Sequence, residues 1–286
     1  MKTSPIKTNN DKYEVRDNQS IELLKELHIL TRDGKMNQDS RRKLKQVFHL
    51  VQFIEPIIAD LSQKKQSFNL VDFGAGKSYL GFLLYDLVAK HLPHPFQIIG
   101  IDLREDLVQH SKELAQRIHF EQMLFYHLNT QEALVSKDLP QQIDIVTALH
   151  ACNTATDDAI NFALYRNVPH IVLVPCCQAE LAGLLKEKKS QVLKNNYFSA
   201  LWKFPIHTRE FGSHLTNVMR CLYLESCGYE VTVTELVGWE HSMKNELIIA
   251  RKLQSSSKSQ QASEQLKHLL LEFNLESIAP RFKINL

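Results

Sequence analysis

The sequence lacks a long apolar run and an excess of one charge. No stretch of its 286 residues reaches the roughly 18 apolar residues that a membrane-spanning helix needs. Lys and Arg number 34 against 32 Asp and Glu, and the formal net charge of +2 creates no strong field that would attract polyanions. Any nucleic-acid binding must therefore come from a local patch on a globular protein.

The sequence also contains few cysteines, and their number is odd. Five cysteines, an odd number, fit a reducing compartment better than a disulfide framework. The opening residues, MKTSPIKTNNDKYE, contain no apolar segment of the kind found in secretory signal peptides. We therefore expect a cytoplasmic protein with no membrane segment. The oligomeric state is not indicated.

The N-terminal part is predicted to be helical after a flexible tail. Residues 1–18 are polar and aperiodic. The spacing of apolar residues predicts a short helix from Ile21 that ends near Asp33, and a longer helix through residues 44–58. The second helix carries a basic cluster at its start, which consists of Arg41, Arg42, Lys43 and Lys45.

From Phe68 onward, short apolar runs alternate with longer mixed segments, as in βαβ units. Strands are predicted at about 68–73, 97–102, 123–128, 143–149 and 170–175. The connections are long enough for right-handed crossovers, so these strands should be parallel. Two last strands, at about 230–237 and 245–251, are joined by a short connection and are predicted to be antiparallel.

The region after the fifth strand mixes helical and irregular patterns. We expect a Lys-rich helical stretch, an irregular aromatic segment over 195–212, a helix over about 213–227 capped by Gly228, a linker over 255–263 and a final amphipathic helix.

The strongest local signal is NLVDFGAGKSYLGFLLYDLV at 69–88, which places a strand, a Gly-x-Gly turn and a helix in succession. A phosphate-cradling P-loop needs a glycine five residues before Gly76, where Val71 stands. A dinucleotide fingerprint needs a small residue three after Gly76, where Tyr79 stands. Both an ATPase and an NAD enzyme are therefore disfavoured.

A nucleoside cofactor without a pyrophosphate remains. Asp72 closes the first strand, and Gly74 and Gly76 allow the backbone to approach a ligand closely. Asp102 ends the next strand, where a carboxylate can accept hydrogen bonds from both ribose hydroxyls. The alternative is a glycine-rich turn that serves only chain reversal.

Beyond the third strand, Asn129 and Thr130 are candidates to meet an adenine edge. The D-x-G-x-G turn with its downstream aspartate resembles motif I and the ribose-binding acidic position of class I S-adenosylmethionine-dependent methyltransferases.

Histidine and cysteine residues follow the fourth and fifth strands. His150 and Cys152 should face Cys176 and Cys177, because those strands are neighbours in a sheet of this class. Zinc accepts three cysteines with one histidine, but no C-x-x-C pair is present. We favour small buried thiols that line a substrate pocket and assign no metal.

Three blocks make the resemblance more specific: LHACNTATDDAI (149–160), VPCCQAEL (174–181) and EHSMKNELIIAR (240–251). They are similar to blocks of one methyltransferase group, which includes bacterial methyltransferases of unassigned substrate and the methyltransferase half of glutathione-transferase-C-terminal-domain-containing proteins. More distantly they resemble tRNA 2′-O-methyltransferases. Asn153 and Gln178 depart from many relatives at the presumed substrate edge, so the substrate is not carried over.

This resemblance, which covers roughly residues 40 to 252, implies an α/β fold with a Rossmann-like sheet. The sheet is expected to have seven mostly parallel strands with an antiparallel last strand, preceded by N-terminal helices. The expected organisation is a flexible tail (1–18), a helical extension (19–66), an S-adenosylmethionine-binding methyltransferase domain (67–252), and a linker with a C-terminal helix (253–286).

The resemblance also implies the residues of the site. Cofactor binding falls to Asp72, Gly74, Ala75, Gly76, Asp102, Leu103, Asn129, Thr130 and Leu149. Candidate catalytic residues are His150, Cys152 and His241, with the histidines as bases and the thiols as less favoured nucleophiles. Substrate binding falls to Cys176, Cys177, Gln178, Glu240, Lys244 and Asn245, although Glu240, Lys244 and Asn245 also fit an ordinary polar turn.

Three functions remain open. The first is methylation of RNA, either tRNA or rRNA, with the basic cluster binding its phosphates. The same cluster fits a solvated helix start equally well. The second is methylation of a small molecule or protein, with an aromatic segment as a lid over the site. These aromatic residues could equally belong to the core: Tyr197, Phe198, Trp202, Phe204 and Phe211. The third is a scaffold that binds S-adenosylmethionine without catalysis.

Overall fold

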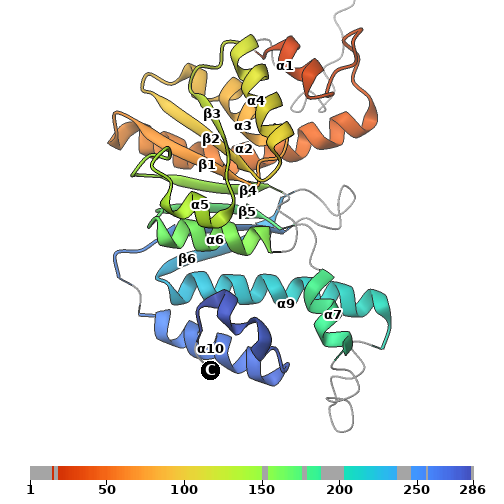
Figure 1. Ribbon diagram of the computed structural model, residues 1–286, viewed down its shortest axis with the longest axis vertical. Coiled ribbons are helices and arrows are strands. Elements are labelled where there is room, and N and C mark those ends of the chain that lie inside the picture. The colour runs from red at the N-terminus through yellow and green to blue at the C-terminus, as the bar shows by residue number, and fades with distance from the viewer. Residues whose placement is uncertain are drawn as a thin grey trace, which may run out of the picture. The chain divides into compact units, whose positions relative to one another are not determined.

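The strands of the computed structural model form one mixed sheet (Figure 1). The model describes Val15 and residues 19–149, 154–175, 179–187, 203–236, 246–255 and 257–284. The strands are β1 (Phe68–Phe73), β2 (Phe96–Asp102), β3 (Met123–His127), β4 (Ile145–Leu149), β5 (His170–Val174), β6 (Tyr229–Glu235) and β7 (Glu246–Lys252). Their order in the 7-stranded sheet is β3-β2-β1-β4-β5-β7-β6, which confirms the predicted architecture.

One compact unit comprises residues 1–127 and 236–243. Its helices are α1 (Ile21–Glu26), α2 (Gln38–Lys64), α3 (Tyr79–Leu87), the short 3-10 helix η2 (Ala89–His91) and α4 (Glu105–Arg117). Strands β1, β2 and β3 are parallel, as predicted. Aromatic side chains join α3 to β3, since the ring centroids of Phe82 and Phe125 lie 5.5 Å apart. This packing fixes where α3 begins after the glycine turn.

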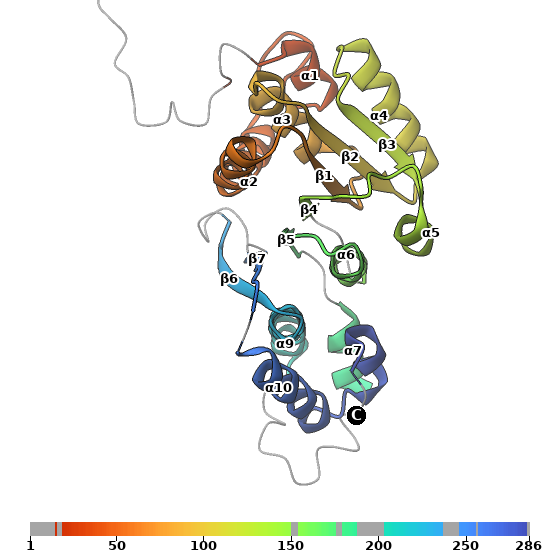
Figure 2. The ribbon, with the colours of Figure 1, turned by 90° about the vertical axis from the view of Figure 1, so that its left-hand side faces the viewer.

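The second unit comprises residues 128–235 and 244–286. Its helices are α5 (Thr130–Val135), α6 (Ala155–Tyr165), α7 (Ala179–Glu187), α9 (Pro205–Ser226), α10 (Ser259–Glu272) and the 3-10 helix η4 (Glu276–Phe282). Strands β4 and β5 are parallel, and β7 runs antiparallel to both β5 and β6. Figure 2 shows α9 between the strands of this unit and α10, with which it is in contact.

Three helix boundaries differ from the sequence prediction. Helix α1 ends at Glu26, well before Asp33, and the chain then turns at His28, whose φ is 54°. Helix α9 begins at Pro205, so residues 205–212 are helical and the irregular segment predicted there is wrong. Helix α10 begins at Ser259, so the second half of the predicted linker over 255–263 is also wrong. Gly228 follows α9 with a φ of 86°, as expected of a helix cap.

Within the described parts of the chain, no helix combines the length and apolarity that a bilayer crossing requires. Most of the predicted tail over 1–18 lies outside the described residues. The predicted domain boundaries stay predictions.

Candidate functional site

The glycine turn predicted between the first strand and its helix is present between β1 and α3. Gly74 and Gly76 have φ values of 68° and 60°, in the left-handed region that favours glycine. The amide of Ala75 donates to the carbonyl of Ile101 at 3.0 Å, which ties the turn to β2. Because no side chain projects from the glycines, the turn itself places only backbone atoms in the path of a ligand.

The carboxylate of Asp102 meets this turn. Its Oδ2 atom accepts a hydrogen bond from the Gly76 amide at 2.6 Å, and the side chain is 7 % exposed. Arg104 donates to Oδ1 through its backbone N–H at 2.9 Å and through Nε at 3.0 Å. The turn and the acidic end of β2, which lie 26 residues apart in the sequence, therefore form one site.

These contacts control the charge of Asp102. Burial acts to raise the pKa of its carboxyl, but hydrogen bonds from Arg104 and from the Gly76 amide outweigh that cost. The pKa of Asp102 consequently lies below its ordinary value of 3.8, and the group is a charged acceptor at neutral pH. Asp72, the second-last residue of β1, is buried beside Gly100 of β2.

Two exposed side chains border the acidic end of β2. Leu103 is 66 % exposed, which is unusual for a leucine directly after a buried strand. The Nε2 atom of His127 lies 3.0 Å from the Leu103 carbonyl oxygen. Sequence reasoning missed His127, which lies opposite Asp102 in the parallel register that the structure shows for β2 and β3.

The side chains of Asn129 and Thr130 make local contacts. Asn129 caps α5: its Oδ1 accepts from the Glu132 amide at 2.9 Å, and the Glu132 carboxylate accepts from the Asn129 amide at 2.8 Å. Thr130 donates a hydrogen bond to Asp158 of α6. Burial nevertheless raises the pKa of Asp158, and the negative charge of Asp157 acts in the same direction. The adenine-binding role of Asn129 and Thr130 stays a prediction.

The strands that precede the histidine and cysteine residues are adjacent, as expected. Leu149 ends β4 and pairs in register with Val174 of β5. The residues predicted beyond these strand ends and in the β6–β7 connection lie outside the described residues: His150, Cys152, Cys176, Cys177, Gln178, Glu240, His241, Lys244 and Asn245. Their assignments stay predictions. Within the described residues, no cluster of three metal-ligating side chains occurs.

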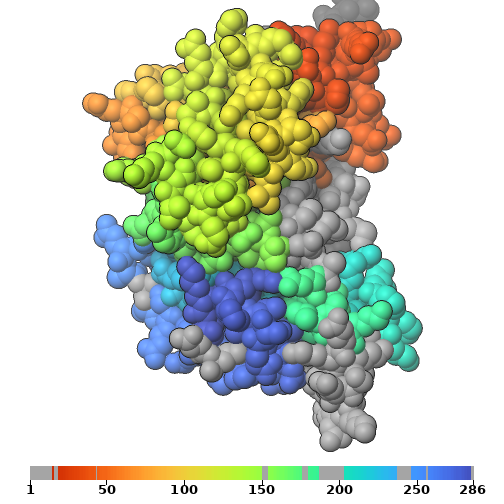
Figure 3. Space-filling view, viewed as in Figure 1, coloured from red at the N-terminus to blue at the C-terminus, as the bar shows by residue number. Residues whose placement is uncertain are grey.

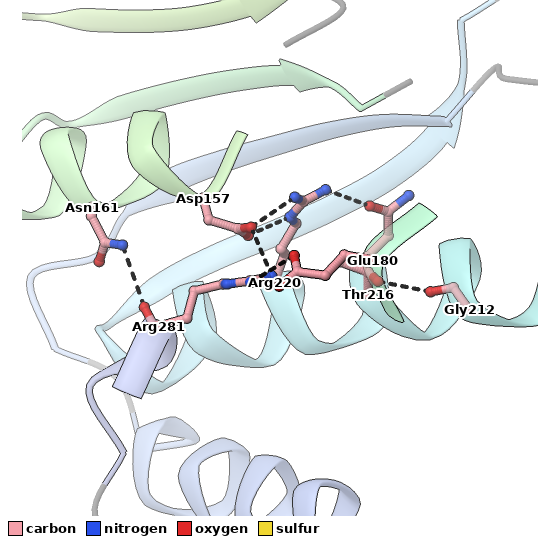
Figure 4. Close-up of polar contacts among 8 residues, drawn as sticks. Asp157, Asn161, Glu180, Gly212, Thr216, Arg220 and Arg281 are labelled. Atoms are coloured by element: carbon pink, nitrogen blue, oxygen red, sulfur yellow. Dashed lines mark hydrogen bonds and ion pairs between the residues drawn. The ribbon is translucent and has the colours of Figure 1, made fainter. Parts of the chain in front are cut away.

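Asp157, from the A-T-D part of the first sequence block, lies in a buried ionic network (Figure 4). Its two carboxylate oxygens accept hydrogen bonds from Nε and Nη2 of Arg220 in α9, at 2.6 and 3.0 Å. Arg220 is 0 % exposed, and its Nη1 also donates to Asn217 at 3.1 Å. The aspartate of the block therefore holds α6 against α9.

Arg281 of η4 connects α6 and α7, the helices that follow the predicted histidine and cysteine residues in the sequence. Its Nη1 lies 3.4 Å from Asp157 Oδ2 in the first turn of α6. Its Nη2 donates to both oxygens of Glu180, in the first turn of α7, at 2.6 and 2.7 Å. Figure 3 shows the C-terminal segment, in dark blue, against the green surface of α7. Sequence reasoning gave Arg281 no role.

The basic cluster lies at the start of α2. Asn37 caps this helix by accepting from the Ser40 amide at 2.8 Å. Arg41 and Arg42 are exposed, and Arg42 Nη1 is 3.7 Å from Asp39. The side chain of Lys43 lies outside the description. Both interpretations of the cluster, phosphate binding and a solvated helix start, stay open.

The aromatic residues proposed as a lid are only partly described. Phe204 precedes α9 and is exposed. Phe211 instead packs on Phe273, the residue that follows α10, with ring centroids 5.5 Å apart. Tyr197, Phe198 and Trp202 lie outside the described residues.

The strand order, the antiparallel β7 and the glycine turn at the end of β1 define the class I methyltransferase fold. Comparison with known families gives the same class. A family model described as a methyltransferase domain matches residues 42–184, half of the 286-residue chain. The chain belongs to this family of methyltransferase domains.

Curated relatives share the sequence over part of their length. The chain is 27 % identical over 203 residues to a glutathione S-transferase C-terminal domain-containing protein homolog of Drosophila pseudoobscura pseudoobscura, covering 64 % of this chain and 33 % of that protein. It is 25 % identical over 239 residues to the human glutathione S-transferase C-terminal domain-containing protein, covering 77 % and 35 %. The chain thus spans about a third of the length of these relatives.

Solved structures with similar coordinates include magnesium protoporphyrin IX methyltransferase from Synechocystis with bound SAH, at a TM-score of 0.44 and 15 % identity over 82 % of this chain and 96 % of that one. The N-terminal domain of human METTL16 in complex with SAH gives a TM-score of 0.46 and 12 % identity over 82 % and 79 %.

Proposed function

We propose that this chain is an S-adenosylmethionine-dependent methyltransferase. One observation carries the proposal: the Asp102 carboxylate lies 2.6 Å from the Gly76 amide, at a turn of two left-handed glycines. A carboxylate at this place favours a ligand with hydroxyl donors and disfavours a chain of phosphates, because like charges repel. Membership of the methyltransferase-domain family supports the same choice.

The described residues fit the nucleoside part of this cofactor. Asp102 supplies charged acceptors for the two ribose hydroxyls, and the two glycines of the turn add no side chain of their own. The exposed Leu103 offers an apolar surface for adenine, and His127 beside it offers an aromatic ring. This set would select adenosine through shape and hydrogen bonding.

When bound, S-adenosylmethionine supplies an activated methyl group on a sulfonium. The protein mainly orients the acceptor and excludes water. His150 or His241 would remove the acceptor proton, because histidine titrates near neutral pH. Glu240, Lys244 and Asn245 would bind the acceptor together with Cys176, Cys177 and Gln178. Cys152 is the less favoured catalytic candidate, as a thiolate nucleophile.

For the acceptor we propose RNA. The exposed Arg41 and Arg42 at the start of α2 support this choice, because guanidinium groups bind phosphates. A small-molecule or protein acceptor is the second candidate, and the exposed Phe204 supports it.

Titration calorimetry of the full chain with S-adenosylhomocysteine tests the cofactor. We expect binding by the wild type and a Kd raised about tenfold or more in Asp102→Asn, since hydrogen bonds to a charged acceptor contribute about 1.5–3 kcal/mol. Asp60→Asn, which removes an exposed carboxylate from α2, is the matched control and should bind normally. Uptake of ATP or NAD in place of S-adenosylhomocysteine would refute the proposal.

Labelled S-adenosylmethionine tests the acceptor. Transfer of label to a tRNA or rRNA fraction, lost at high salt and in Arg41→Ala with Arg42→Ala, would support RNA. Label in protein or small-molecule fractions would support the second candidate. Cofactor binding without transfer to any cell fraction would indicate a scaffold.

A further inference from the structure

The carboxylate that we assign to the ribose is already engaged within the chain. Besides its backbone N–H and its Nε, which donate to Oδ1, Arg104 donates through Nη2 to Asp102 Oδ2 at 3.2 Å. The Gly76 amide donates to the same Oδ2 at 2.6 Å. A carboxylate has about four lone-pair positions. These four donors therefore use the acceptor capacity that two ribose hydroxyls would need.

The four donors differ in how easily they can leave. The two amides belong to the backbone, one in the glycine turn and one at the residue that precedes α4. The guanidinium, in contrast, ends a side chain that is 60 % exposed, so water can solvate it when it moves away. Only the Nε and Nη2 bonds can be exchanged for ligand hydroxyls without disturbing the fold.

The guanidinium also covers the turn itself. A Cβ atom placed on Gly76 would lie 3.3 Å from Arg104 Nη2. The same group therefore lies over both parts of the proposed nucleoside site, the carboxylate of Asp102 and the backbone at Gly76. A ligand that approaches the turn closely meets Arg104 first.

We infer that Arg104 competes with the cofactor ribose for Asp102 and must leave the carboxylate before the cofactor binds. The exchange replaces two guanidinium N–H···O bonds with two hydroxyl O–H···O bonds. This inference rests on the proposed function, because it concerns the affinity of that same site. It predicts an effect of unusual sign: removal of a cationic residue beside the ligand tightens binding.

The test is calorimetric titration of S-adenosylhomocysteine into the full chain carrying Arg104→Gln. We expect the Kd to fall about two- to fivefold relative to the wild type, the factor that corresponds to loss of an ion pair whose cation is exposed. Arg251→Gln is the matched control, because Arg251 is 61 % exposed and pairs with Glu230 at 2.7 Å in the same chain. The control should leave the Kd unchanged.

Ionic strength provides a second readout. Salt weakens exposed ion pairs, so raising it from about 0.05 to 0.5 M should tighten binding by the wild type and leave Arg104→Gln nearly constant. Arg104→Lys, which keeps the charge but not the planar fork, should give an intermediate Kd and serves if the glutamine variant does not fold.

An unchanged or raised Kd in Arg104→Gln would overturn the inference, since it would mean that Arg104 is neutral toward the ligand or contacts it. A folded wild type that does not bind S-adenosylhomocysteine would instead refute the proposed function. The two failures are therefore distinguishable.

Discussion

Asp157 and Arg220 form a two-pronged ion pair, with oxygen–nitrogen distances of 2.6 and 3.0 Å, between residues 63 positions apart. Both side chains are almost fully removed from water. The pair joins the first turn of α6 to the middle of α9, and Arg281 adds a second cation at its edge. The charges are arranged as two guanidinium groups and two carboxylates, the second carboxylate being Glu180.

We expect Arg220→Met to lower the free energy of unfolding by about 3–5 kcal/mol, because it leaves a buried carboxylate without its main cation. Urea denaturation measures the change. The double variant Asp157→Asn with Arg220→Met should recover much of the loss, since replacing both charges removes the unpaired group. Arg251→Met, at an exposed pair, is the control and should change little. Equal losses in the two single arginine variants would contradict the argument.

The C-terminal segment should contribute strongly to stability. Phe282 is 1 % exposed, and its ring meets that of Tyr223 in α9 with centroids 5.7 Å apart. Phe282→Ala should therefore lower the free energy of unfolding by about 3–5 kcal/mol, as is typical of buried phenylalanine truncations. Phe204→Ala, at an exposed phenylalanine, is the matched control. A small effect at Phe282 would show that η4 is not packed in solution.

Two glycines should respond to alanine with opposite sign. A Cβ on Gly100 would lie 2.7 Å from the ring of Phe125, so Gly100→Ala should destabilise by about 1–3 kcal/mol. Gly183 lies inside α7, and a Cβ there would meet nothing within 4 Å. Gly183→Ala should stabilise by about 0.5–1 kcal/mol, because alanine loses less backbone entropy in a helix. Thermal denaturation of both variants measures whether each substitution lowers or raises stability relative to the wild type.

The stability contributed by Asp102 should depend on pH. Its folded-state pKa lies below the ordinary 3.8, so the contribution is present above about pH 4 and is lost as the pH falls through the folded-state pKa. Wild type and Asp102→Asn should therefore differ by a constant unfolding free energy near neutral pH and converge in acid. Denaturation curves across this range provide the measurement, with Asp60→Asn as the exposed control. If the difference in unfolding free energy between the wild type and Asp102→Asn widened in acid, the predicted direction of the pH dependence would be wrong.

Much of the fold could be predicted from the sequence because its signals are local. The strand and helix boundaries around the glycine turn follow from apolar periodicity and from residues that need a positive φ, such as Gly74 and Gly76. The early start of α9 also had a local signal, since Pro205 occupies its first position, where proline is favoured. The aromatic residues nearby obscured it.

The remaining features differ in how far the sequence reveals them. The capping box between Asn129 and Glu132 was readable, because the two residues lie three positions apart, whereas the adenine contact of Asn129 stays a prediction. The pairing of Asp157 with Arg220 was not readable, because no periodicity links residues in α6 and α9. Arg104 was likewise missed, because its competition for Asp102 emerges only when both side chains are placed.

The packed C-terminal segment has a practical consequence for work with this protein. Phe282 is enclosed, and the neighbouring Arg281 bridges α6 and α7. A shortened variant that stops before η4 would lose both of these anchors. Variants designed for expression should therefore retain Glu276–Phe282.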